Sequence, residues 1–327
     1  MFWKIKRGNE VSTKSNDNGR AFEFICLKTL YAKILEYRPV EVENNSSFFA
    51  AKRAWGNIDP SIKEALIASA HAAVKSILNL EPLIVEDGND TLTLKMQLDE
   101  EGEKGDVRDI LIIRRNIHWE IGLSLKHNHF AVKHSRLAKT LDFGDKWFSV
   151  PCSREYWSDI HPIFDMLETQ KHMGAKWSDI HDKENDVYIP LLQAFVNEIK
   201  RSNRKYNNIP RKMVEYLLGE FDFYKVISVD RQKIAQIQAF NLRGTLNKRS
   251  NEKQPEIVIP VSSLPTRIVS LDFKPNSTNT VELYMDGGWQ FSFRIHNAST
   301  IVETSLKFDV QIIGMPATII TINCTWI

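Results

Sequence analysis

Apolar residues recur at helical spacing in three long stretches of the chain. From Gly19 to Ile34 they return every three or four positions, and an alanine-rich stretch at about 60–80 repeats the pattern. Such spacing predicts amphipathic helices. Residues 155–222 also read as mostly helical, with prolines near the expected helix starts. The N-terminal residues 1–18 are polar and form a separate N-terminal extension.

A different period appears between the second and third helical stretches. Residues 91–98 alternate strictly between apolar and polar, which predicts a half-buried strand. Two further apolar runs, at 109–113 and 119–126, are separated by a short link that predicts a hairpin. Helices that flank such strands indicate an α/β fold.

From residue 224 onward the composition changes, because Pro, Ser, Thr and Asn punctuate short β-type runs. This shift predicts a core with additional helices at 19–223 and a β-rich region at 224–327. The expected strands of this β-rich region are 256–261, 267–273, 280–285, 290–295, 308–313 and 317–322.

Composition narrows the class of protein without selecting a function. The chain has 327 residues, 43% of them hydrophobic, and contains no apolar run long enough to span a bilayer. Its three scattered cysteines suggest neither a disulfide framework nor a zinc site, so a reducing cytoplasm fits best. A net charge of +2 neither supports nor excludes DNA as a partner, because a single basic cleft suffices to grip a duplex.

The strands predicted at 109–113 and 119–126 carry residues suited to phosphodiester hydrolysis. This reaction needs a metal to polarise the phosphoryl oxygen and activate water, and Mg²⁺ prefers carboxylate and water oxygens. Asp109 stands directly before its strand and is the expected metal ligand, with Asp106 as the rival aspartate. Ser124 and Lys126 are two apart on the next strand and therefore share a face, so Lys126 is the expected catalytic lysine. This arrangement resembles the PD-(D/E)xK nuclease core, with Ser124 where that pattern has an acid. The resemblance implies a mixed central sheet flanked by helices.

The missing acid must then come from elsewhere. Glu23, in the first helix, is the favoured second carboxylate and metal ligand. Glu120 shares a face with Lys126, but six residues at the strand rise separate them by roughly 20 Å. Glu120 and Asp142 are the remaining alternatives.

The segment after Lys126 is dense in hydrogen-bond donors and almost free of acids, which suits DNA phosphates, although a solvated basic helix face would look similar. The expected DNA-binding residues in this segment are His127, Asn128, His129, Lys133, His134 and Arg136.

Longer strings resemble one particular family, the HaeIII restriction endonucleases, from about residue 14 to the end. The strings are Gly19–Glu23, Ser46–Trp55, Gly105–Asp109, Ser124–Leu137 and Trp289–Ala298. The resemblance implies Mg²⁺-dependent cleavage of duplex DNA at GGCC, between the central G and C, with blunt ends. It also implies a partner cytosine methyltransferase that protects host DNA.

The C-terminal β-rich region is the expected place for base reading. In the major groove, guanine offers two acceptors to Arg or Lys, and cytosine offers a donor to Asp or Glu. Arg294, His296, Asn297, Lys307 and Asp309 form such a set around two predicted strands.

Two other functions use the same residues. A structure-selective repair or recombination nuclease would share the metal chemistry, and a non-catalytic DNA-binding protein would keep Asp109 and Lys126 for structural reasons. A blunt palindromic cut is compatible with a homodimer and with a monomer that nicks each strand in turn, so the sequence leaves the oligomeric state open.

Overall fold

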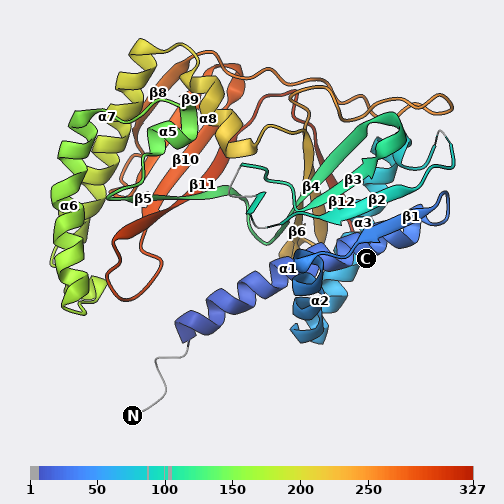
Figure 1. The fold of residues 1–327 in the computed structure, drawn as a ribbon, viewed down its shortest axis with the longest axis horizontal. Helices are drawn as coiled ribbons and strands as arrows, with labels where there is room; N and C mark the ends of the chain where they lie inside the picture. Colours follow the sequence, from blue (N-terminus) through green and yellow to red (C-terminus); the bar gives the residue numbers. More distant parts are fainter. Residues whose placement is uncertain (1–6, 87, 99, 102–104, 327) are drawn as a thin grey trace. The chain divides into compact units, whose positions relative to one another are not determined.

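The computed structural model, drawn in Figure 1, describes residues 7–86, 88–98, 100–101 and 105–326. The chain forms two compact units, each assembled from segments that are distant in the sequence. The first unit comprises Met1–His129, Phe221–Ser262 and Thr318–Ile327, and the second comprises Phe130–Glu220 and Ser263–Ala317. This division differs from the single boundary expected at residue 223, because the strands after that point are shared between two sheets, one in each unit.

A mixed seven-stranded sheet forms the centre of the first unit, in the order β1-β2-β3-β4-β6-β7-β12. The pairs β1/β2 and β4/β6 are parallel, and the other neighbours are antiparallel. The three strands expected between residues 91 and 126 are confirmed as β2, β3 and β4, including the hairpin. The strands are β1 (Val40–Glu43), β2 (Leu92–Met96), β3 (Ile110–Arg114), β4 (Trp119–His127), β6 (Phe223–Val229), β7 (Ile234–Phe240) and β12 (Thr321–Thr325).

The helices described in the first unit pack on one face of this sheet in a single hydrophobic core. They are α1 (Arg7–Ile34), α2 (Ser46–Asn57) and α3 (Pro60–Leu80). The expected helices at 19–34 and 60–80 are confirmed, and α2, which begins after the capping side chain of Asn45, is additional. α1 starts at Arg7 rather than at Gly19, because no proline interrupts the polar residues and the backbone ladder continues beyond the apolar pattern.

Strand alternation sorts the side chains of β4 between two faces. Leu123 and Leu125 belong to the core beneath α1 and α3. Ser124 and Lys126 therefore lie on the opposite face, which the first-unit helices leave uncovered. The candidate site depends on this second face.

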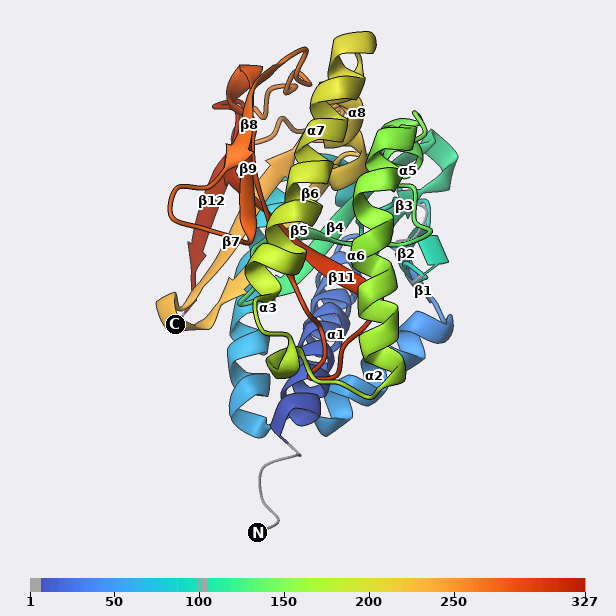
Figure 2. The same cartoon turned by 90° about the vertical axis from the view of Figure 1, so that its left-hand side faces the viewer.

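A five-stranded antiparallel sheet, ordered β5-β11-β10-β9-β8, forms the second unit together with four described α-helices. Its strands are β5 (Ala131–Ala138), β8 (Ile268–Phe273), β9 (Thr280–Met285), β10 (Gln290–His296) and β11 (Ser305–Gly314). Its helices are α5 (Phe143–Phe148), α6 (Arg154–His172), α7 (Ile189–Lys205) and α8 (Ile209–Leu218). Figure 2 shows α6 and α7 beside each other, and an aromatic cluster joins Trp147 and Phe195 on the helices to Phe293 and Phe308 on the sheet.

The expected strands at 267–273, 280–285, 290–295 and 308–313 are confirmed as β8, β9, β10 and part of β11. The run at 317–322 is only partly a strand, because β12 begins at Thr321. The strand expected at 256–261 is wrong: the backbone of Ile259 bonds to the side chains of Asn241 and Asn247 instead of to a neighbouring strand.

Two general expectations can be compared with the described residues. No helix in the described part of the chain is long and apolar enough to cross a membrane. Cys26, Cys152 and Cys324 are all free thiols.

Candidate active site

Asp109 stands where β3 and β4 separate. Its backbone still joins the sheet, since its N–H donates to the Leu123 carbonyl at 2.7 Å and its carbonyl accepts from Gln97 at 2.9 Å. Its side chain then supplies the hydrogen-bond acceptor that a neighbouring strand would otherwise provide, because Oδ2 accepts the backbone N–H of Leu125 at 2.6 Å. The carboxylate therefore caps β4 at the point where β3 no longer reaches it.

Lys126 and Ser124 complete a small cluster around the same oxygen. The Nζ of Lys126 lies 3.2 Å from Asp109 Oδ2, and the Ser124 hydroxyl donates to it at 3.4 Å. Asp109 and Lys126 are partly exposed, with 24% and 27% of their side chains accessible. The structure thus brings together three of the residues selected from the sequence, at a place that a substrate can reach.

Asp106 has a different environment. It forms a forked ion pair with Arg108, with Arg108 Nη2 and Nε at 2.7 and 2.8 Å from its two oxygens, and also accepts from Gln97 at 2.6 Å. Arg108 in turn binds Glu120 at 2.7 Å. Both rival carboxylates of the sequence analysis are therefore neutralised by one buried arginine.

Arg108 is an additional residue of this site that was not expected from the sequence. Burial opposes its charge, but the hydrogen bonds and charges of Asp106 and Glu120 outweigh burial and raise the pKa of its guanidinium. Its side chain stacks on Phe221 and crosses Gly122 so closely that a Cβ at Gly122 would lie 2.1 Å from Arg108 Cδ. Arg108 thus links the segment that precedes Asp109 to β4 and to Phe221, which lies just before β6.

Glu23 lies half-buried on α1, between Phe22 and Phe24, both of which are in the core. α1 packs against β4, the strand that carries Ser124 and Lys126. The thiol of Cys26 has a pKa raised first by burial and then by the negative charge of Glu23. The position of Glu23 is set by α1. Asp142, the other alternative, caps α5 by accepting the N–H of Asp145, and so belongs to the second unit.

Lys225 is a further charged residue beside the cluster. It is the register partner of Ser124 on the adjoining strand β6, on the same face, and is only 3% exposed. Burial, assisted by the positive charge of Lys126, lowers the pKa of Lys225 to about 7. A lysine inside the otherwise apolar run of β6 was the signal that could have identified it.

His127 and Asn128, expected to bind DNA, are both bonded to Asp230. His127 Nε2 lies 2.7 Å from Asp230 Oδ2, and Asn128 donates to the same oxygen at 2.9 Å while accepting the Asp230 N–H at 3.0 Å. Although burial favours the neutral acid, these hydrogen bonds lower the pKa of Asp230. His127 and Asn128 therefore connect the end of β4 to the turn after β6. The next residue, His129, is exposed.

The basic residues of β5 lie on two different faces of the strand. Lys133 points to the helices of its unit, where its Nζ donates to the Tyr216 carbonyl at 2.9 Å and lies over the Tyr216 ring, and burial lowers its pKa to about 8. Arg136 is exposed and donates to Ser305 Oγ at 2.7 Å. The side chain of His134 lies outside the described part of the structure.

Sheet register gathers most of the C-terminal candidates into two adjacent rows. Arg294 is paired with Asp309, and His296 with Lys307, across β10 and β11. On the neighbouring strand β5, Arg136 is paired with Lys307 and therefore extends the row that Lys307 and His296 form. Asn297 is occupied locally, accepting from the Tyr188 hydroxyl at 3.1 Å and donating to the Ser299 carbonyl at 2.7 Å.

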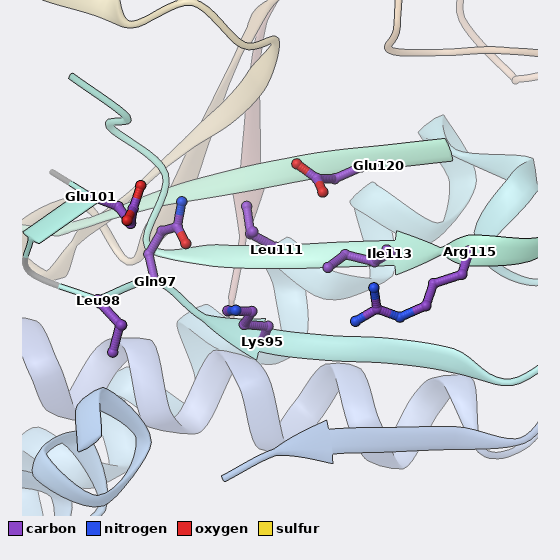
Figure 3. Close-up of a pocket in the computed structure, with 8 residues that line it drawn as sticks. All are labelled: Lys95, Gln97, Leu98, Glu101, Leu111, Ile113, Arg115 and Glu120. Atoms are coloured by element: carbon purple, nitrogen blue, oxygen red, sulfur yellow. The ribbon is translucent and has the colours of Figure 1, made fainter. Parts of the chain in front are cut away.

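A cavity of about 330 Å³ opens on the helix-free face of the first sheet, as Figure 3 shows. The basic and acidic side chains Lys95, Arg115, Glu101 and Glu120 line it together with apolar groups of β3. Asp109, Ser124 and Lys126 are not among its lining residues. The catalytic candidates therefore occupy a strand edge rather than this cavity.

The cluster at Asp109 suits a hard cation that is shared with a phosphate. In the described part of the chain, no three His, Cys, Asp or Glu side chains meet as a protein-only metal site would require. Mg²⁺ does not need such a cage, because it typically binds one or two carboxylates, water and substrate phosphate. Asp109 Oδ2 is held by the groups already named, and Oδ1 has no hydrogen-bond partner among the described residues.

The sequence is similar to known proteins over nearly its whole length. The sequence profile described as HaeIII restriction endonuclease matches residues 19–316. The chain is 56% identical over 317 residues to the type II restriction enzyme HaeIII of Haemophilus aegyptius, covering 97% of this chain and 99% of that protein. No solved structure gives a significant match.

The chain is therefore a type II restriction endonuclease, a hydrolase that cleaves phosphodiester bonds of duplex DNA at specific sites. It belongs to the HaeIII restriction endonuclease family.

Proposed function

We propose that this endonuclease cleaves GGCC, between the central G and C and with blunt ends, in a Mg²⁺-dependent reaction centred on Asp109 and Lys126. The observation that carries the proposal is the position of the Asp109 carboxylate at the split between β3 and β4, with the Lys126 ammonium 3.2 Å away. The proposed core is of the PD-(D/E)xK type. The 56% identity to the HaeIII enzyme over nearly the whole chain supports the GGCC target.

Asp109, Ser124 and Lys126 are proposed to have different roles in the reaction. Asp109 would hold Mg²⁺ through Oδ1, while the Leu125 N–H and Ser124 hydroxyl keep its carboxylate oriented through Oδ2. Bound Mg²⁺ would polarise the phosphoryl oxygen and lower the pKa of its water. Lys126 would hydrogen-bond the attacked phosphate or the entering water and offset the negative charge that develops there.

Glu23 is proposed as the second anionic ligand, which Ser124 cannot be. α1 packs on the other face of β4, so this proposal rests on the half-buried position of Glu23 among apolar residues of α1. Arg108 leaves Asp106 and Glu120 less suited to that role, since both are already ion-paired to it.

The open face of the second sheet is the proposed DNA-binding surface. Arg136, Arg294 and Lys307 lie on that face in neighbouring strands, and phosphate and base contacts both use such donors. His129 would add a contact near the catalytic cluster. Lys133 and Asn297 support the unit from within, and His127 and Asn128 are proposed to position the β4 end rather than to touch DNA.

The biological setting follows from the same activity. An enzyme that cuts GGCC in the cytoplasm requires a cytosine methyltransferase that modifies this sequence in host DNA. A homodimer would place one cluster at each strand of the palindrome.

Cleavage by the Lys126→Ala variant tests the assignment. We expect it to bind a GGCC duplex in Ca²⁺ as tightly as the wild-type protein, and to lose cleavage in Mg²⁺. Wild-type cleavage that continues undiminished in EDTA would refute the metal requirement, and rapid cutting by Lys126→Ala would refute the role of the lysine. A structure-selective nuclease would leave an intact duplex uncut, and a binding protein would shift the duplex without cutting it.

A further inference from the structure

Arg294 occupies the middle of the second sheet. Its strand β10 and the neighbouring β11 are both interior strands, and Arg294 is the register partner of Asp309. Phe293 and Phe308 adjoin this pair in sequence and pack into the aromatic cluster beneath the helices. Because side chains alternate along a strand, Arg294 and Asp309 share the opposite, helix-free face.

The two side chains differ sharply in exposure. Arg294 keeps 55% of its side chain accessible, whereas Asp309 keeps 8%. Arg294 Nη2 contacts Asp309 Oδ2 at 3.2 Å, and Gln311 Nε2 reaches the same oxygen at 3.4 Å. The carboxylate thus forms the base of the pair, and the guanidinium extends outward from it.

The contact leaves hydrogen-bonding capacity unused at both ends. Asp309 Oδ1 is buried and has no hydrogen-bond partner in the described structure. A guanidinium has five N–H donors, and the contact with Asp309 engages one nitrogen of Arg294. An unsatisfied buried acceptor costs stability, so its retention calls for a role other than stabilisation.

We infer that Arg294 reads a guanine of the recognition sequence and that Asp309 is the residue that positions it. Resting on the proposed function, this assigns a base contact within the DNA-binding face. The forked edge of the guanidinium matches the O6 and N7 acceptors of guanine, and the one-point contact with Asp309 sets its direction while leaving donors for the base. Asp309 does not itself read a cytosine amino group, because its free oxygen is buried.

The test measures single-turnover cleavage in Mg²⁺ of a short GGCC duplex and of duplexes in which 7-deazaguanine replaces each guanine in turn, removing N7. The variants are Arg294→Lys, which keeps the charge but loses the fork, and Asp309→Asn. Arg136→Lys is the matched control, because Arg136 is an exposed arginine on the same face. Thermal denaturation and binding of an unrelated duplex in Ca²⁺ confirm that each variant is folded.

We expect the wild-type rate to fall roughly ten- to hundredfold at one 7-deazaguanine position. Arg294→Lys and Asp309→Asn should be slower on the normal duplex and nearly indifferent to the replacement at that position, while Arg136→Lys should keep the full penalty. Should Arg294→Lys keep the wild-type penalty at every guanine, Arg294 does not read guanine N7 and the inference is overturned. If Asp309→Asn alone behaves as wild type, the positioning role is overturned.

Failure of the proposed function would give a different result from failure of this inference. A wild-type enzyme that leaves GGCC uncut but cuts elsewhere refutes the target, and the same replacements in the guanines of the true site then decide the inference. Because Arg294 is more than half exposed, its substitution should be tolerated even if Asp309→Asn fails to fold.

Discussion

Replacing the two neighbouring aspartates by asparagine should have opposite effects on stability and on cleavage. Asp109→Asn should remove activity and leave the fold nearly intact. Asp106→Asn should weaken the fold and leave the chemistry of the remaining folded enzyme largely in place. The contrast follows from which charges each carboxylate contacts.

The magnitudes come from the two environments. An asparagine in place of Asp109 could still accept the Leu125 N–H, and the Lys126 contact is partly exposed, so its loss should cost at most about 1 kcal/mol of stability. Asp106 and Arg108 are 9% and 4% exposed, and removing one partner of a buried pair costs roughly 3–5 kcal/mol. Glu120 and the retained amide hydrogen bonds reduce this to about 2–4 kcal/mol for Asp106→Asn. For cleavage, losing a metal-binding charge worth several kcal/mol should slow Asp109→Asn by roughly a thousandfold or more.

The assay pairs urea denaturation with single-turnover cleavage under conditions where both variants are folded. Asp109→Asn should unfold near the wild-type midpoint and give no measurable product, while Asp106→Asn should unfold at clearly lower urea and still cut. The reasoning is refuted if Asp109→Asn cuts at a near-normal rate while a folded Asp106→Asn is inactive, because the wrong aspartate would then have been assigned.

Three further outcomes are expected. Glu23→Gln should raise the Mg²⁺ concentration needed for half-maximal cleavage more than it weakens DNA binding, with partial rescue by Mn²⁺; an unchanged Mg²⁺ titration would remove Glu23 from the site. Burial raises the pKa of Glu81 to about 8 from 4.5, so the folded chain holds a proton that the unfolded chain releases between these values, and stability should fall as pH rises through this window. Glu81→Gln should abolish this slope in urea midpoints between about pH 5 and 8, and a slope equal to that of the wild type would contradict the assignment. Gly122→Ala should lower the melting temperature, at a cost of about 1–3 kcal/mol, because its methyl would displace the Arg108 side chain; unchanged melting would show that Arg108 moves freely.

The central strands and the contact between Asp109 and Lys126 were predictable because both depend on local patterns. Alternation identified β2, apolar runs identified β3 and β4, and the short link between these runs predicted that β3 lies beside β4. Asp109 and Lys126 then met because one stands at the start of β3 and the other near the end of its antiparallel partner. Here the sequence separation is small enough for strand geometry to imply proximity.

What could not be predicted depends on pairing between distant segments. Arg136 and Lys307 are neighbours only because β5 pairs with β11, and no periodicity within either strand specifies that choice. The same holds for β12, which returns from the end of the chain to pair with β7 in the first unit. The role of Arg108 was hidden for a related reason, since its partners Asp106, Glu120 and Phe221 lie on three separate segments.

The most direct measurement of the central claim is the fragment map of a sequenced plasmid digested in Mg²⁺, with the fragment ends sequenced. The account predicts that every end falls between the G and C of a GGCC site and is blunt. It also predicts that internal cytosine methylation blocks cutting and that Asp109→Asn gives no fragments. Ends at unrelated sequences, or an identical fragment pattern from Asp109→Asn, would contradict it.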